Sequence, residues 1–89
     1  MEDTKVRTKL KLSAVRGGES ALIRQLVGGQ AFLSRLAPLG FILGARLRVV
    51  QNPGRGPLIV TIYNTRIALG RGEADKIVVE PLAGGDDDN

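Results

Sequence analysis

The chain has 89 residues, no cysteine, no histidine and a formal net charge of +4. This length fits one domain with a small core, and the lack of cysteine excludes disulfides. Without cysteine or histidine, the chain also lacks the usual ligands of zinc, copper and iron clusters and most nucleophilic and acid–base groups. The composition therefore disfavours an enzyme and favours a binding module.

Charge is unevenly distributed along the chain. Three of the nine acidic side chains are the consecutive Asp86–Asp88, and the other residues hold 13 basic and six acidic side chains, a net charge of +7. A basic body can bind nucleic acid, an anionic membrane surface or an acidic protein, and charge alone does not choose among them. No apolar run has the length of a membrane span, and the charged first residues do not resemble a signal peptide. These features, together with the absent cysteine, favour a cytoplasmic protein.

In chain order, we expect a flexible N-terminus over residues 1–9, one domain over residues 10–82 and a disordered acidic tail over residues 83–89. Segments with alternating or β-branched composition predict five short strands: residues 19–27, 45–51, 58–64, 66–70 and 77–82. We expect a helical turn over residues 12–15 and a hairpin turn at residues 64–65. Residues 71–76 are expected to form a loop or a single helical turn.

Alternation assigns faces within the first two predicted strands. It groups Ala21, Ile23 and Gln25 on one face of the first, and it points Leu47 and Val49 into the core from the second. Strands this short, with glycine at their corners and one helix between the first and second, predict a mainly β protein folded as a small five-stranded barrel.

Residues 30–40 predict the one helix of the chain. The apolar residues with helical spacing are Phe32, Leu33, Leu36 and Leu39. We expect Leu36 and Leu39 to lie in the core. Pro38 limits the length of the helix, and Gly40 supplies a left-handed stop. Gly44 then lets the chain enter the next strand through a tight turn, and Pro57 ends a second turn that is rich in glycine and proline.

Two pairs of residues after the helix are candidates for contact with a partner. Phe41 and Ile42 are adjacent and apolar, so they cannot both point inward, and we expect this pair to be more open than Leu36. Arg46 and Arg48 share one side of a strand. The alternative interpretation is that the apolar pair seals the barrel and that the arginines are solvated outward positions.

An ordered series of short motifs resembles the FeoA family of small cytoplasmic proteins in bacterial ferrous-iron uptake. The matching residues are Arg35-Leu36, Leu39-Gly40-Phe41, Leu43-Gly44, Pro57-Leu58, Ile67-Ala68-Leu69, Ala74 and Ile77-Val78-Val79. Together with the first strand, they extend the resemblance over about residues 10–82. No single motif is specific; the order and the spacing carry the resemblance.

The resemblance implies a five-stranded SH3-like barrel with the helix packed across it. It also implies an accessory or regulatory role without catalysis, in which the protein binds the cytoplasmic part of FeoB, a membrane transporter with a G domain. No cofactor is expected beyond weak binding of a divalent cation such as Fe2+, and no direct membrane insertion is expected.

Binding of nucleic acid, or of another protein, by a small basic barrel remains the alternative function. The aromatic residues of the chain are Phe32, Phe41 and Tyr63. Proteins that bind single strands normally stack bases on several exposed rings, so nucleic acid is not the expected partner.

Overall fold

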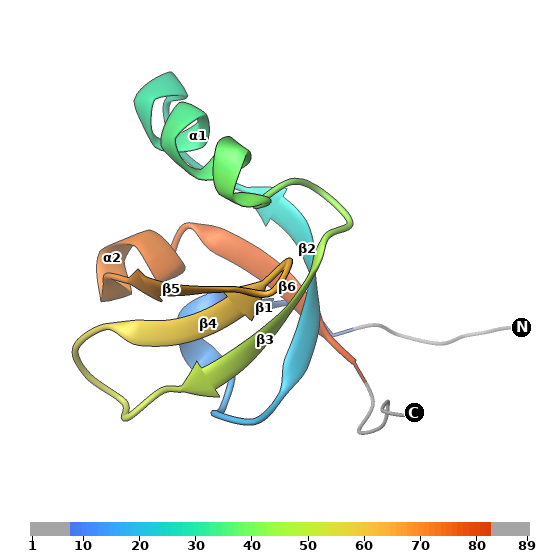
Figure 1. The fold of residues 1–89 in the computed structure, drawn as a ribbon, viewed down its shortest axis with the longest axis vertical. Helices are drawn as coiled ribbons and strands as arrows, with labels where there is room; N and C mark the ends of the chain where they lie inside the picture. Colours follow the sequence, from blue (N-terminus) through green and yellow to red (C-terminus); the bar gives the residue numbers. More distant parts are fainter. Residues whose placement is uncertain (1–7, 83–89) are drawn as a thin grey trace, which may run out of the picture.

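The computed structural model describes residues 8–82, which form one strongly bent antiparallel sheet with short helical segments in the connections between its strands (Figure 1). The elements in chain order are β1 (Leu10–Lys11), the 3-10 turn η1 (Leu12–Ala14), β2 (Ser20–Leu26), α1 (Gln30–Leu36), the 3-10 turn η2 (Ala37–Leu39), β3 (Arg46–Gln51), β4 (Leu58–Ile62), β5 (Thr65–Leu69), α2 (Arg71–Ala74) and β6 (Ile77–Pro81).

The sheet has the strand order β1-β6-β2-β3-β4-β5 and wraps around one apolar core. Buried residues such as Ile23, Leu47, Val60 and Val79 reach this core from four different strands. The mainly β prediction is confirmed. The structure adds a sixth strand, the two-residue β1, which pairs with β6, and it resolves the loop after β5 as the single helical turn α2.

Pairing across the sheet places a row of polar side chains on its outer face. Ser20 lies opposite Arg48, Arg48 opposite Thr61, and Thr61 opposite Arg66. Leu47 and Val49, which flank Arg48, are buried, as alternation predicts. The row therefore crosses β2, β3, β4 and β5 on the side away from the core.

A β-bulge interrupts the alternation in β2. Ile23 pairs with Val79 and Gln25 with Val78, so Arg24 is an extra residue. Gln25 is therefore exposed, although strict alternation grouped it with the buried Ile23. Leu26 turns back and packs against the core instead.

Helix α1 buries Phe32 and Leu36 and is followed by the tighter turn η2, which ends at Gly40. Gly40 has the left-handed conformation expected of a helix stop (φ +103), and its N–H donates to the Ala37 carbonyl. Leu39 is 39% exposed, so the prediction that it belongs to the core is wrong. A 3-10 turn has a different angular step from an α-helix, which moves Leu39 off the buried face.

At the far end of β3, side-chain hydrogen bonds hold the loop of residues 52–57. The Asn52 amide nitrogen donates to the carbonyl oxygens of Ser13 (2.9 Å) and Val15 (2.7 Å). The Arg71 guanidinium donates to the Asn52 side-chain oxygen (2.7 Å) and to the Ser13 carbonyl (3.2 Å). Residues from three separate segments are thereby joined, and Pro57 leads from this loop directly into β4.

Candidate functional site

The four residues predicted to contact a partner separate into a buried one and three exposed ones. Phe41 is fully buried in the core, whereas Ile42 is 49% exposed and both Arg46 and Arg48 are exposed. The expectation that Phe41 lies open at the surface is wrong. Gly40 reverses the chain after η2, and the Phe41 N–H donates to the Leu36 carbonyl, so the ring enters the barrel. Phe41 therefore cannot contact a partner directly; its ring supports the loop of residues 40–44 from the core side.

Main-chain hydrogen bonds fasten the loop of residues 40–44 to β2. The Gly44 N–H donates to the Ile23 carbonyl (2.7 Å), and the Ile23 N–H donates to the Ala45 carbonyl (2.9 Å). Gly44 has φ +87, a conformation that glycine adopts readily and most residues do not. Because backbone groups and Phe41 fix the loop, the side chains of Ile42 and Leu43 are left at the surface.

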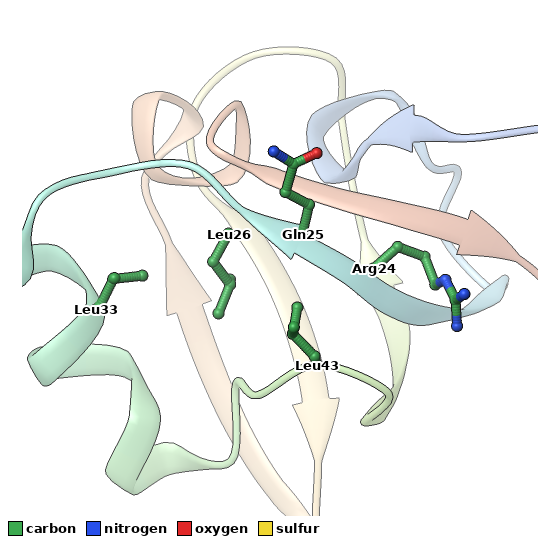
Figure 2. A pocket seen from close by; sticks show the side chains of 5 residues that line it. All are labelled: Arg24, Gln25, Leu26, Leu33 and Leu43. Carbon is green, nitrogen blue, oxygen red and sulfur yellow. The ribbon is translucent and has the colours of Figure 1, made fainter.

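A cleft opens between this loop, helix α1 and the end of β2. We call it the apolar cleft; it is lined by Arg24, Gln25, Leu26, Leu33 and Leu43. Figure 2 shows the three leucines pointing into a shared space, with Arg24 directed away along β2. Leu43 is 65% exposed, which is unusual for a large apolar side chain and is typical of a contact surface.

The bulge in β2 explains why Leu26 lines this cleft. With strict alternation Leu26 would share the outer side of the strand with Leu22; the extra residue Arg24 re-aims it toward Leu33. Sequence reasoning missed Leu26, Leu33 and Leu43 as lining residues. Alternation cannot locate a bulge, and it cannot tell how a helix lies against a strand.

A second depression lies on the outer face of β3 and β4. We call it the basic groove; it is lined by Ser20, Arg46, Leu47, Arg48, Thr61, Tyr63 and Asn64. Two of the predicted contact residues, Arg46 and Arg48, therefore meet here, while Ile42 belongs to the loop beside the apolar cleft. The structure thus divides the predicted site between two neighbouring surfaces.

Tyr63 lines the basic groove and lies against Gly40, in the loop beside the apolar cleft. With Asn64 it forms a two-residue turn between β4 and β5, one residue earlier than the predicted hairpin, and both residues have positive φ (49° and 62°). Tyrosine is uncommon in this conformation. Its ring, 67% exposed, lies directly over Gly40, where an added methyl group would approach a ring carbon to 2.3 Å. Gly40 therefore serves both as the helix stop and as the seat of this ring.

The arginines of the groove are available to a ligand. Over residues 8–82, the ion pairs join Arg24 to Glu80 (3.5 Å) and Arg35 to Glu73, and no acidic side chain pairs with Arg46, Arg48 or Arg66. Cationic side chains that have no partner favour contact with an anionic surface.

The acidic residues give no sign of a metal centre within the described part of the chain. No group of three or more His, Cys, Asp and Glu side chains lies together among residues 8–82. The three consecutive aspartates, Asp86–Asp88, lie outside the described residues. The same described residues include no helix that has the length and apolar character needed to cross a bilayer.

Comparison with known proteins identifies relatives of nearly the whole domain. The family model described as "FeoA domain" matches residues 10–81. A protein of Methanocaldococcus jannaschii with the name "Putative Fe(2+) transport protein A" is 35% identical over 69 residues, which is 78% of this chain and 83% of that protein. A fusion of Fe(2+) transport protein A with the Fe(2+) transporter FeoB, from Porphyromonas gingivalis, is 35% identical over 75 residues; the match covers 83% of this chain and 9% of the fusion.

A solved structure shares the fold. The crystal structure of FeoA from Stenotrophomonas maltophilia, complexed with zinc and described as a procaryotic SH3 domain protein, matches with a TM-score of 0.65 and 35% identity. The alignment covers 79% of this chain and 88% of that one. This likeness confirms the SH3-like prediction for the barrel.

Proposed function

This chain belongs to the FeoA family, and from that premise we propose that it is a non-catalytic accessory protein of ferrous-iron uptake that binds the cytoplasmic part of a FeoB-type transporter. The observation that carries the proposal is the Porphyromonas gingivalis fusion, in which a related segment and FeoB belong to one polypeptide. Fusion holds two modules at a high effective concentration, which favours their association. The proposal places this chain in the cytoplasm.

We place the contact on the loop of residues 40–44 together with the two surfaces beside it. Protein interfaces commonly have an apolar centre surrounded by polar and charged residues, and arginine is enriched there. Here Ile42 and Leu43 supply the apolar centre, and Arg46 and Arg48 supply the charged margin. An acidic region on the transporter's G domain fits such a surface.

A titration of the 15N-labelled protein with the purified G domain, with and without guanine nucleotide, tests this placement. We expect NMR shift changes concentrated at residues 40–48 and at Tyr63. The variant Ile42→Ser/Arg46→Glu removes one apolar and one cationic contact and is expected to weaken binding about tenfold or more, or about 1.4 kcal/mol.

The matched control is Val50→Ser/Arg55→Glu. It changes the same residue classes at exposed positions that line neither surface. Equal loss of affinity in the two variants would contradict the placement of the site. An absence of shift changes at high G-domain concentration would contradict the choice of partner domain.

A further inference from the structure

Two arginines of the basic groove are free to bind an anion. Arg46 and Arg48 lie two residues apart on the outer face of β3, about 7 Å along the strand, and both are exposed. Over residues 8–82, neither guanidinium forms an ion pair with a carboxylate. The planar guanidinium group presents several N–H donors and suits carboxylate or phosphate oxygens. The groove therefore favours a compact anion.

Two hydroxyl groups line the groove beside these arginines. Ser20 on β2 and Thr61 on β4 are the cross-strand partners of Arg48. Each hydroxyl can donate a hydrogen bond, so side chains on three adjacent strands offer donors to the same depression. A carboxylate has two oxygens to accept them, whereas a terminal phosphate group has three. A phosphate group therefore uses these donors more fully than a carboxylate does.

An aromatic ring also lines the groove. Tyr63 has φ 49 in the turn after β4, and its ring lies against Gly40, yet the residue is 67% exposed. Because Arg48 pairs with Thr61, the antiparallel register continues toward Arg46 on β3 and Tyr63 after β4. An exposed aromatic ring can stack on a nucleobase. The groove thus combines a stacking surface with cationic side chains.

The number of exposed rings limits the size of such a ligand. Phe32 and Phe41, the other aromatic residues of the chain, are buried. Proteins that bind single-stranded nucleic acid stack successive bases on several rings, so one exposed ring suits one base. The groove has a volume of about 410 Å³, which is within the range of small-molecule sites. These features favour a single nucleotide over a nucleic-acid strand.

We propose that the basic groove binds a nucleoside diphosphate, with the base stacked on the Tyr63 ring and the phosphates held by Arg46 and Arg48. Stacking alone does not select among bases, because every base has a π-face. The inference does not rest on the proposed function. The proposed transporter contact uses the same two arginines, so a bound nucleotide competes with the transporter for them.

Titration of the 15N-labelled protein with ADP, adenosine and inorganic pyrophosphate tests the two halves of the site. At low ionic strength we expect ADP to bind about tenfold or more tightly than either adenosine, which lacks the phosphates, or pyrophosphate, which lacks the base. Shift changes should concentrate at residues 46–48, Thr61 and Tyr63. Intermolecular NOEs between the base protons of ADP and the ring protons of Tyr63 should be observed in the unaltered protein.

Two variants separate stacking from charge. Tyr63→Asn removes the ring and keeps a residue that tolerates positive φ; it should weaken ADP binding about fivefold or more and leave pyrophosphate binding unchanged. Arg46→Gln/Arg48→Gln should weaken the binding of both ligands about tenfold. The matched control Arg16→Gln/Arg55→Gln, at exposed positions outside the groove, should change neither.

ADP that binds no more tightly than pyrophosphate, or equally well to Tyr63→Asn, would overturn the proposal, as would shift changes spread over the whole surface. Leu43→Ser distinguishes this site from the transporter contact. Leu43 lines the apolar cleft and not the basic groove, so this substitution should leave ADP affinity unchanged. All these titrations use the chain alone, so their result is independent of whether the G domain binds.

Discussion

The two ends of β3 both carry glycine-rich loops, yet they are held in place in different ways (Figure 1). At the hydrogen-bonded end, residues 52–57, side chains of Asn52 and Arg71 bond to backbone carbonyls of another segment. At the apolar end, residues 40–44, backbone bonds and the buried Phe41 ring hold the loop. The loop of residues 40–44 therefore leaves the large apolar side chains of Ile42 and Leu43 exposed to a partner, whereas the loop of residues 52–57 contains no large aliphatic side chain.

The largest effect is expected where the apolar end is anchored. Phe41→Ala removes a fully buried ring and leaves a cavity under the loop, which we expect to lower the free energy of unfolding by about 3–5 kcal/mol. Chemical denaturation measures this loss, and Ile42→Ala, at the exposed neighbour, is the control. A loss below about 1 kcal/mol would show that the loop does not depend on the ring.

A smaller loss is expected at the hydrogen-bonded end. Asn52→Ala removes the donor to the Ser13 and Val15 carbonyls and the acceptor for Arg71, and it should cost about 2–3 kcal/mol. The exposed neighbour provides the control Gln51→Ala, with an expected change within about 0.5 kcal/mol. If both substitutions had the same small effect in denaturation, the described network would not be what holds this end.

The substitution with the smallest expected effect on stability gives the clearest contrast between the two ends of β3. Leu43→Ser acts on a side chain that is 65% exposed, so the free energy of unfolding should change by no more than about 0.5 kcal/mol. Affinity for the G domain should nevertheless fall about fivefold or more. Calorimetry or fluorescence titration measures this affinity for Leu43→Ser and for the control Val50→Ser. The Val50 side chain is also exposed but lies outside the apolar cleft. Unchanged affinity would remove Leu43 from the contact.

Strand assignments could be predicted from the sequence because the side-chain period of a strand is two, and β3 obeys it: Leu47 and Val49 point inward while Arg46 and Arg48 point outward. The predictions for Phe41 and Leu39 are both wrong: the structure buries Phe41 and exposes Leu39. Their orientation depends on where an α-helix tightens to a 3-10 turn and on how far Gly40 reverses the chain, and neither leaves a signal in residue spacing.

The candidate site was predicted less completely than the fold. The exposure of Arg46, Arg48 and Ile42 could be predicted from local pattern alone, because exposure of a strand face or of a loop is a local property. Leu26 was missed because a bulge turned it, and Tyr63 because its place depends on the ring meeting Gly40 across the fold. Contacts of this kind are set by strand register and packing between distant segments.

The position of Tyr63 gives this protein an optical property. The chain has one tyrosine and no tryptophan, so its intrinsic near-ultraviolet fluorescence comes essentially from a single ring. That ring lies over Gly40 and lines the basic groove. A partner or an anion that enters the groove changes the surroundings of the one emitting group, so the unmodified protein carries its own reporter of occupancy.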